Sequence, residues 1–415
     1  MNTVQRAFKY RFYPTFEQER ILNRHIGAAR FVWNWALAIR SAAWTDRQER
    51  ITGIDLMREL TKLRNSADTD WLSEVSATVM QQVLRDQDTA FKNFFDGLKG
   101  KRPRMGYPRF KARATARKSL RYTRGEFSYR NGQLFLAKMR EEPLNIMWSR
   151  PLPEGVAPSS VTVSCDPTGR WHISILTEDT PELAVETGLA VGIDLGIKTF
   201  AALSDETVVA HPALLRRHEL RLKRYQKRLS RCQKGSLNRA KARVKVARQH
   251  AKVADARRDF LHKTSTAIIN RYDVICIEDL AVKNMVKNHC LAKSISDCGW
   301  AEFRRQLEYK AAWYGKRIIV IDRFHPSSRL CSDCGWKNLH LKLSDREWVC
   351  LDCGTLHDRD INAAKNILAA GLAATACGED VRPKKKPRAS SRKGRQPSAK
   401  QELVPSGRSQ RPSTA

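Results

Sequence analysis

Alternating apolar and polar residues mark the first segment of the chain. Aromatic residues at positions 8, 10 and 12 are separated by Lys9 and Arg11, the period-two pattern of a strand with one buried face. Pro14 ends this pattern, and Thr15 lies three residues before Gln18, the spacing of a capping box that opens a helix. From there to about residue 100 the pattern is helical, and it predicts a helix-bundle core stripe of Val83, Ala90, Phe91, Phe94 and Leu98.

Residues 100–118 separate the helical region from a β-rich one. The segment is punctuated by proline and glycine, and its basic side chains are interleaved with aromatic ones, which suits contact with a nucleic-acid backbone and stacking on bases. An ordinary exposed loop is the alternative. Short runs between turn signals over residues 119–185 predict strands. The candidate nucleic-acid contacts are Lys9, Arg11, Arg102, Arg104, Tyr107, Arg109, Phe110 and Lys111.

The third region begins near residue 187 and contains two apolar runs that each end on an acid. The first run ends on Asp194, directly before a glycine turn, and the second ends on Glu278. Residues 199–203 predict a further strand, antiparallel to the first. Between the two acids, residues 214–271 form a strongly basic helical stretch, in which like charges repel unless a polyanion lies nearby. We interpret this stretch as a pair of helices that cradles nucleic acid.

Asp360 supplies a third acid, at the start of a helical sequence that follows Asp358. Carboxylates so far apart in sequence can converge only through the fold, and three of them can hold two Mg²⁺ ions about 3.5–4 Å apart. Such a pair of ions stabilises the attacking and leaving oxygens of a phosphodiester. An acid at one strand end is usually a turn or cap residue. It is therefore the combination of Asp194, Glu278 and Asp360 that indicates a metal-dependent nuclease.

Four cysteines lie between the second and third acids. Cys331 and Cys334 form one CxxC pair, and after fifteen residues Cys350 and Cys353 form another. This spacing predicts a closed tetrahedral zinc site, structural because all four ligands are cysteine. Two disulfides or four buried thiols are the alternative, but no signal peptide is recognisable, so we expect a reducing compartment without disulfides. Arg329, just before the first pair, is a further candidate phosphate contact.

The charge of the chain indicates a polyanionic partner. Lysine and arginine outnumber aspartate and glutamate by 76 to 43 in 415 residues, a formal net charge of +33, and nucleic acid is the polyanion that such an excess favours. No apolar stretch reaches the roughly 18 residues of a membrane span. Residues 378–415 are rich in Pro, Ser, Lys and Arg and have almost no apolar content, so they are predicted to form a disordered basic tail.

Taken together, these motifs resemble the TnpB family of transposon-encoded RNA-guided nucleases, which are related to the type V CRISPR effectors. The resemblance extends over nearly the whole chain. Its most specific stretches are Gly192–Lys198, Ile277–Leu280, Ser294–Trp300, Gln306–Lys310, Pro326–Ser328 leading into Cys331, and His357–Ala364.

The resemblance implies an α/β multidomain fold. It would comprise an RNase H-like (RuvC) nuclease domain with a zinc-ribbon insertion, a wedge-like β-barrel and a helical recognition lobe. Residues 1–14 and 119–185 would form the discontinuous barrel, and residues 15–118 the recognition lobe and basic linker. Residues 186–377 would form the nuclease domain, with the zinc ribbon at about 327–356 and the tail at 378–415.

The resemblance also assigns the site. Asp194, Glu278 and Asp360 would be the three catalytic acids and the ligands of two Mg²⁺ ions, and all three are intact. Adjacent strand residues face opposite sides, so only one of Glu278 and Asp279 can face the ions, and the resemblance selects Glu278. It likewise selects Asp360 over Asp358, which is left to cap the helix. The four cysteines would hold one structural Zn²⁺.

The implied function is RNA-guided cleavage of DNA by a protein of a bacterial mobile element. A guide RNA from the transposon end would pair with one strand of double-stranded target DNA, while the protein reads a short flanking motif. We expect a cytoplasmic, nucleoid-associated protein with no membrane contact and no obligate protein partner. A transposase that performs strand transfer and a non-cleaving RNA-guided repressor are the alternatives. The intact acids disfavour the repressor, and the zinc motif before the third acid disfavours the transposase.

Overall fold

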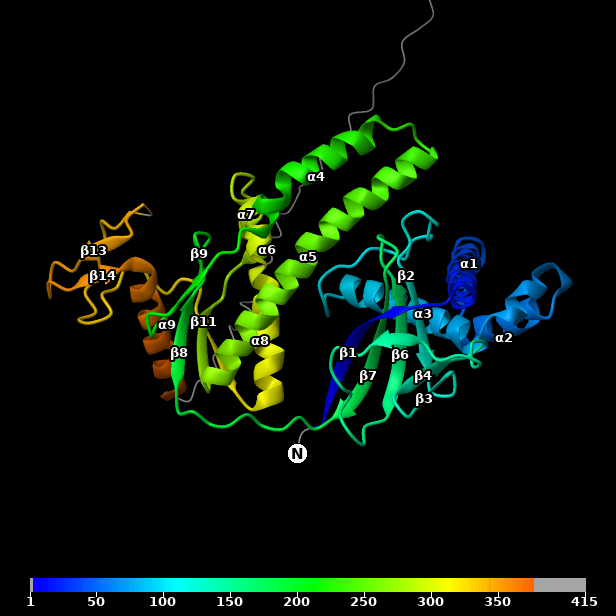
Figure 1. The fold of residues 1–415 in the computed structure, drawn as a ribbon, viewed down its shortest axis with the longest axis horizontal. Helices are drawn as coiled ribbons and strands as arrows, with labels where there is room; N and C mark the ends of the chain where they lie inside the picture. Colours follow the sequence, from blue (N-terminus) through cyan, green and yellow to red (C-terminus); the bar gives the residue numbers. More distant parts are fainter. Residues whose placement is uncertain (1–2, 343, 377–415) are drawn as a thin grey trace, which may run out of the picture.

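The computed structural model describes residues 3–342 and 344–376, which form two lobes joined by an extended segment along one side of the molecule (Figure 1). The predicted tail at 378–415 lies outside these residues, as does Cys377. Each lobe is built on a five-stranded sheet. Among the described helices, none is both long enough and apolar enough to cross a membrane.

The N-terminal lobe is organised around a sheet that the first strand completes. Strand β1 (Val4–Tyr13) pairs antiparallel with β7 (Trp171–Asp179) on one side and with β5 (Asn145–Met147) on the other. The full order is β2-β6-β7-β1-β5, with β2 at Lys118–Thr123 and β6 at Pro158–Cys165. Phe8, Tyr10 and Phe12 are buried, as their alternation predicted. The expected pairing of residues 1–14 with the strands of 119–185 is thus observed, as an open sheet rather than a closed barrel.

The helices of this lobe form a layer in which the first and last pack against one face of the sheet, and the two between them pack on those helices. They are α1 (Phe16–Arg47), α2 (Gly53–Arg64), the 3₁₀ helix η1 (Ala67–Glu74) and α3 (Ala77–Leu98), and a small hairpin of β3 (Phe127–Arg130) and β4 (Gln133–Leu136) lies beside them. The Thr15 hydroxyl accepts from the Gln18 amide at 3.3 Å, and the Gln18 side chain accepts from the Thr15 amide at 3.1 Å. The predicted capping box is confirmed.

The predicted core stripe on α3 is only partly correct. Val83 packs against the helical core beside Met80 and Leu84, as predicted, whereas Leu98 is 55% exposed. Phe91 and Phe94 pack instead against a residue of the basic linker, Tyr107, with ring centroids 5.4 Å apart in both pairs. The stripe therefore joins the helical core at Val83 and packs against the linker at Phe91 and Phe94.

The C-terminal lobe is a mixed sheet with helices on both faces. Strands β8 (Ala190–Asp194), β9 (Thr199–Leu203), β10 (Val208–Ala210), β11 (Val274–Glu278) and β12 (Arg317–Ile321) have the order β10-β9-β8-β11-β12. β9 pairs antiparallel with β8, as predicted, while β8, β11 and β12 are parallel.

Alternate residues of the strands face the two helical layers. Ile193 and Ile277 belong to a core with α5 (Leu237–Arg271) and α8 (Trp300–Tyr314). Cys276 belongs to a separate core with Ile319 and with Ile367 of α9 (Arg359–Ala376). Because successive strand residues point to opposite faces, α9 covers one side of the sheet and α5 with α8 covers the other (Figure 1). The remaining elements are α4 (Leu214–Arg231), α6 (Val282–Met285), α7 (Ala292–Cys298), β13 (Glu347–Val349) and β14 (Leu356–Asp358).

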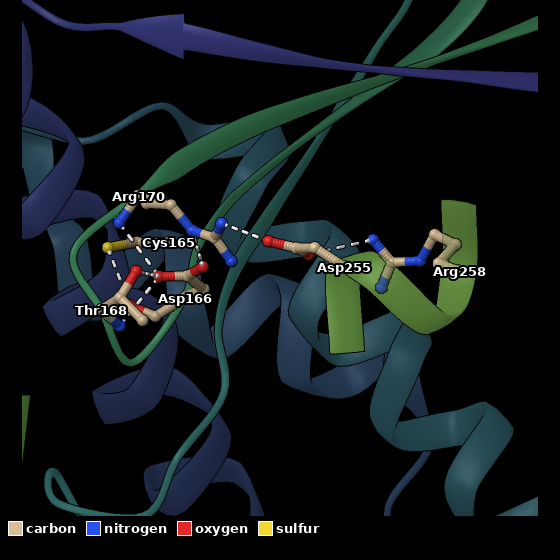
Figure 2. A network of polar contacts seen from close by, with 6 residues as sticks. All are labelled: Cys165, Asp166, Thr168, Arg170, Asp255 and Arg258. Atoms are coloured by element: carbon tan, nitrogen blue, oxygen red, sulfur yellow. Dashed lines mark hydrogen bonds and ion pairs between the residues drawn. The ribbon is translucent and has the colours of Figure 1, made fainter. Parts of the chain in front are cut away.

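An ion-pair network connects the two lobes. Arg170, in the turn between β6 and β7, donates to Asp166 at 2.7 Å and to Asp255 of α5 at 2.5 Å (Figure 2). Asp166 also accepts from the amide and the hydroxyl of Thr168, at 2.8 and 2.5 Å, so the turn is fixed by its own bonds. The guanidinium is thereby held toward α5, and the N-terminal sheet is anchored to the second lobe at this point.

Candidate active site and metal centre

Two of the three acids lie side by side at one end of the central sheet. Asp194 is the last residue of β8 and Glu278 the last residue of β11, and these parallel strands are in register up to the pair Ile193 and Ile277. The carboxyl ends of parallel strands meet at the same edge. Asp194 shares a sheet face with Gly192, and Glu278 shares that face with Cys276, because side chains two apart in a strand point the same way. Both carboxylates therefore face the layer of α9.

A close approach between helix and strand brings the third acid to the same place. A Cβ atom added to Gly192 would lie 2.0 Å from the carbonyl oxygen of Ala364 and 2.6 Å from the amide nitrogen of Leu368. The backbone of α9 thus lies directly on β8 at this glycine. Asp194 lies two residues beyond Gly192 along the strand, and Asp360 lies one helical turn before Ala364. The contact therefore sets Asp360 above the end of β8.

The start of α9 is fixed by Asp358. Its Oδ1 accepts from the amides of Asp360 and Ile361, both at 2.9 Å, which is the bonding of an N-cap residue. The predicted division of roles between Asp358 and Asp360 is consistent with these bonds. The Asp360 carboxylate lies 3.4 Å from the guanidinium of Arg346, so it has an ion-pair partner in the cysteine-bearing segment.

The electrostatics show that Asp194 is affected by the charges of the other two acids. The pKa of Asp194 is raised to about 7, first by burial and then by the negative charges of Glu278 and Asp360. Burial also raises the pKa of Glu278, while a hydrogen bond from Ser327 and the charge of His325 oppose the rise. Oxygen donors that repel one another are a suitable ligand set for Mg²⁺. Among the described residues, the three acids are not a group whose ligand atoms lie close enough together to hold one metal ion.

Asp279 faces away from this cluster. It forms ion pairs with Arg304 of α8 at 2.7 Å and with Arg323 after β12. Its charge is therefore balanced by two guanidinium groups on the far side of the strand from Asp194. The choice of Glu278 over Asp279 is consistent with this geometry.

The four predicted cysteine ligands converge. The sulfur atoms of Cys331, Cys334, Cys350 and Cys353 all lie within 4.8 Å of one another. Two of the separations, Cys331 to Cys353 and Cys334 to Cys350, are 3.6 Å. Zn–S bonds of about 2.3 Å in a tetrahedron place sulfur atoms about 3.8 Å apart, so the cluster fits zinc. No disulfide forms among the cysteines that the structure describes.

Turn and packing residues shape this cysteine cluster. Gly335 and Gly354, each directly after a CxxC pair, have φ angles of 79° and 74°, which a side chain would disfavour. His357 of β14 is buried, with its Nε2 3.0 Å from the sulfur of Cys331 and its ring centroid 4.8 Å from that of Trp348. The sequence patterns did not single out His357 for this role, because a histidine next to an acidic motif has no distinctive spacing.

The sequence did not predict that two asparagines and a serine near the acids are joined by hydrogen bonds. The Ser327 hydroxyl donates to Oε1 of Glu278 at 2.5 Å. Asn362 and Asn366 of α9 bond to the segment that runs from Ser327 to the first cysteine. Their presence in motif-like stretches was the available signal, but spacing alone does not say which side chain touches which acid.

The nucleic-acid candidates fall into three places. Lys9 and Arg11 lie on β1, where the pKa of Lys9 is lowered by partial burial and by the charges of Arg258 and Arg117. The linker contacts α1 at two residues. The Arg109 carbonyl accepts from Trp33 Nε1 at 2.9 Å, and the Lys111 ammonium lies 3.5 Å from the Trp33 ring centroid. The third place is the turn before the cysteines, where Arg329 is exposed.

The basic stretch forms the two predicted helices, α4 and α5, which lie side by side (Figure 1). Asp297 positions the pair: its carboxylate accepts from the Leu215 amide at the start of α4, at 3.0 and 3.2 Å, and from Arg257 of α5 at 2.7 Å. The acids within the stretch are already matched, for example Asp259 with Lys263 at 2.8 Å. The excess cations of this hairpin are thus left to attract an external polyanion.

Three family models match parts of the chain. They are described as probable transposase over residues 172–289, as Cas12f1-like TNB domain over residues 300–367, and as helix-turn-helix domain over residues 1–49. In the structure, the described part of the last segment forms β1 and the single long helix α1. The matches together reach into both lobes.

Whole-chain relatives are similar over most of their length. A protein of Streptomyces pristinaespiralis named "Putative RNA-guided DNA endonuclease" is 52% identical over 402 residues, covering 97% of each chain. The Escherichia coli (strain K12) protein named "Putative RNA-guided DNA endonuclease InsQ" is 36% identical over 392 residues, 90% of this chain and 94% of its own. A cryo-EM structure of a Cas12f1–sgRNA–target DNA complex matches with a TM-score of 0.48 and 14% identity, over 88% of this chain and 99% of that chain. Identity at this level over nearly complete chains places this protein in the TnpB family of RNA-guided DNA endonucleases, as its motifs predicted.

Proposed function

We propose that this protein is an RNA-guided DNA endonuclease of a mobile element, and that Asp194, Glu278 and Asp360 form its cleavage site. The observation that carries the proposal is the meeting of the three carboxylates at one edge of the central sheet, where Glu278 and Asp360 raise the pKa of Asp194. Carboxylates from two strand ends and a helix start are brought together only in the folded chain. Full-length relatives that carry the name of such an endonuclease support the same function.

The residues of the site would act by holding metal and directing water. Two bound Mg²⁺ ions would supply a water nucleophile and neutralise charge on the attacking and leaving oxygens of the phosphodiester. Asp194 and Glu278, at adjacent strand ends, and Asp360, above them on α9, would orient these ligands. Arg346, now 3.4 Å from Asp360, would have to give way to a cation of higher charge. Hydrolysis would leave a 5′-phosphate.

The fold supports the proposed domain assignment. The order β10-β9-β8-β11-β12, with an antiparallel half and a parallel half, is what an RNase H-like (RuvC) domain at residues 186–377 would have. We assign the cysteine segment at about 327–356 as its zinc ribbon, with one structural Zn²⁺ on the four sulfur atoms. Residues 1–14 and 119–185 would be the wedge-like domain, and 15–118 the recognition lobe.

Guide RNA and double-stranded DNA are the proposed partners. The net charge of +33 and the basic hairpin of α4 and α5 support a polyanionic partner beside the acids. Base pairing between a transposon-end RNA and one DNA strand would supply sequence specificity, and the protein would read only a short flanking motif. We propose that it acts on nucleoid DNA in the bacterial cytoplasm. Strand transfer by a transposase is the second candidate, since one matching family model carries that description.

Cleavage of a plasmid library tests the proposal. The library carries random sequence beside a guide-matched target, and the protein is co-expressed with its own flanking locus. We expect wild type to cut guide-matched plasmids that share one flanking motif, and Asp194→Ala to cut none. Asp68→Asn, a change at an exposed acid of η1, is the matched control and should cut normally. Cutting that ignores the guide, or joined rather than hydrolysed ends, would reject the proposal in favour of another nuclease or of strand transfer.

A further inference from the structure

The segment from Ser327 to Ser332 lies between an acid of the candidate cleavage site and the cysteine cluster. At its first residue, the Ser327 hydroxyl donates to Oε1 of Glu278 at 2.5 Å. Near its other end, Cys331 is one of the four converging sulfur ligands. A stretch of six residues thus touches both sites. Displacement of one end of the segment would therefore displace the other end, unless the residues between them were flexible.

Two side chains of α9 remove that flexibility. The Asn366 amide donates to the carbonyl oxygens of Ser327 and Leu330, at 2.8 and 2.7 Å. The Asn362 amide donates to the Leu330 carbonyl at 2.7 Å, and its oxygen accepts from the Ser332 amide at 2.9 Å. Asn362 and Asn366 are one turn apart on the helix that begins with Asp360. The segment is therefore bonded to the same helix that supplies the third acid.

Burial makes these bonds obligatory rather than incidental. Exposed fractions are 6% for Ser327, 1% for Asn362 and 8% for Asn366. A buried amide or carbonyl that loses its partner cannot turn to water instead, so an alternative position of the segment would leave several polar groups unsatisfied. The cysteine cluster is held from its other side by His357, 3.0 Å from Cys331.

The bond to Ser327 has a specific effect on Glu278. A glutamate at a strand end has three side-chain torsions, and its carboxylate would otherwise sample several positions. With Oε1 held by a buried hydroxyl, one orientation is selected, and the other oxygen stays available for a cation. Hydrogen-bond partners of metal-binding side chains commonly change metal affinity or activity by about 10–100-fold when they are removed.

We propose that Ser327 is a positioning residue that orients Glu278 for metal, and that α9 and the folded cysteine cluster hold Ser327 in place through Asn366 and Asn362. The cysteine segment would then help to hold Ser327, and through it Glu278, in addition to stabilising its own fold. The inference rests on the proposed function only in that Glu278 is taken as a metal ligand.

Direct metal binding tests this role without depending on cleavage. Mn²⁺ serves as the probe, and its affinity for the full, zinc-loaded chain is measured by electron paramagnetic resonance. Four proteins are compared: wild type, Ser327→Ala, Ser327→Thr, which keeps the hydroxyl, and Asp194→Asn, which defines the signal of the acid site. We expect Ser327→Ala to bind Mn²⁺ roughly 10–100-fold more weakly than wild type and Ser327→Thr to recover most of the affinity. Zinc content should match in all four, and each protein should remain folded at the temperature of the titration.

A second arm follows single-turnover cleavage against Mg²⁺ concentration. The half-saturating Mg²⁺ concentration should rise for Ser327→Ala, with part of the rate restored at high Mg²⁺, while guide-directed target binding stays unchanged. Equal Mn²⁺ affinity for wild type and Ser327→Ala would overturn the proposal. So would an equal loss in the alanine and threonine variants, since packing rather than the hydroxyl would then matter.

The two arms separate this inference from the proposed function. Wild type that binds Mn²⁺ through Asp194 but cuts no guide-matched DNA would reject the endonuclease and leave the role of Ser327 supported by its effect on binding. Wild type that cuts as expected, with Ser327→Ala unaltered in Mn²⁺ affinity and Mg²⁺ dependence, would reject the role of Ser327 and leave the endonuclease intact.

Discussion

Gly192 and the carbonyl oxygen of Ala364 are so close that a single added methyl group would lie 2.0 Å from that oxygen. The groups in the way are helix backbone, which cannot rotate aside as a long side chain could. Gly192→Ala should therefore displace α9 and lift Asp360 away from Asp194. We expect a loss of guide-directed cleavage of at least tenfold together with a destabilisation of about 1–3 kcal/mol from overpacking. Gly27→Ala on α1, where a Cβ meets nothing within 4 Å, is the control, and its activity should remain.

Zinc should be present at one ion per chain and should be needed for the structure of the cysteine segment. Cys350→Ser removes a buried ligand and should abolish stoichiometric zinc while lowering the unfolding temperature. Cys290→Ser changes an exposed cysteine outside the cluster and should retain the metal. Elemental analysis and circular dichroism measure both effects. Equal zinc content in the two variants would show that the sulfur cluster is not the binding site.

The ion pair between Arg170 and Asp255 should couple the stabilities of the two lobes. Both side chains are partly exposed, so solvent screening limits the coupling to about 0.2–1 kcal/mol. A double-mutant cycle of Arg170→Gln and Asp255→Asn, followed by denaturant unfolding, measures it. Asp259→Asn, which breaks a pair within α5 alone, is the matched control. A coupling indistinguishable from zero would mean that the lobes are joined by other contacts.

Two aromatic residues of the basic linker should behave differently. Tyr107 packs on Phe91 and Phe94, whereas Phe110 is 62% exposed. Phe110→Ala should weaken binding of guide RNA by about 1–3 kcal/mol, the range for loss of one base-stacking contact, with little change in stability. Tyr107→Ala should mainly lower the unfolding temperature. Filter binding and thermal unfolding of both variants distinguish the roles, and unaltered RNA affinity of Phe110→Ala would remove it from the interface.

Lys310 should give the protein an unusual gain of stability at alkaline pH. Its ammonium donates to Ser265, Thr266 and the His262 carbonyl, at 2.7, 2.6 and 3.0 Å, and burial lowers its pKa to about 8. Between this value and the ordinary lysine value the unfolded chain binds more protons than the folded one. Stability therefore rises with pH in that window, by up to about 3 kcal/mol.

The neutral variant Lys310→Met isolates this effect. The difference in unfolding free energy between wild type and Lys310→Met should move in favour of wild type as pH increases from 8 towards 10.5, the ordinary value for lysine. Lys263→Met, at an exposed position of α5, controls for the loss of a lysine charge. A difference that stays constant over this range would show that the folded protein accommodates the ammonium without cost.

Helix caps and strand ends could be predicted from the sequence because they depend on interactions between residues close together in the chain. The capping box at Thr15, the alternation before it and the cap at Asp358 each depend on residues within four positions. The acids that end β8 and β11 and the paired cysteines could be found for the same reason. The assignment of the three acids to one site, by contrast, came from family resemblance, because no local pattern states which strands are neighbours.

Long-range packing set the limits of the sequence interpretation. The apolar stripe on α3 was assigned to a helix bundle, yet Phe91 and Phe94 receive Tyr107, since a hydrophobic face does not specify its partner. Ser327 lies in the family-like stretch Pro326–Ser328, but that pattern does not state which acid it contacts, and 49 positions separate Ser327 from the carboxylate of Glu278. Gly192 was noted only as part of the family-like stretch Gly192–Lys198, and its closeness to α9 follows from the crossing of two elements far apart in the chain.

The position of β1 has a consequence for how the chain is made. This strand is synthesised before its partners, yet it lies inside its sheet, between β7 and β5, and its partners over Trp171–Asp179 follow more than a hundred and fifty residues later. The nascent chain must carry an aromatic strand without a partner through the synthesis of an entire lobe. Contacts between such distant segments form slowly. Shielding of β1 during translation, rather than the stability of the finished fold, would then limit the yield of functional protein.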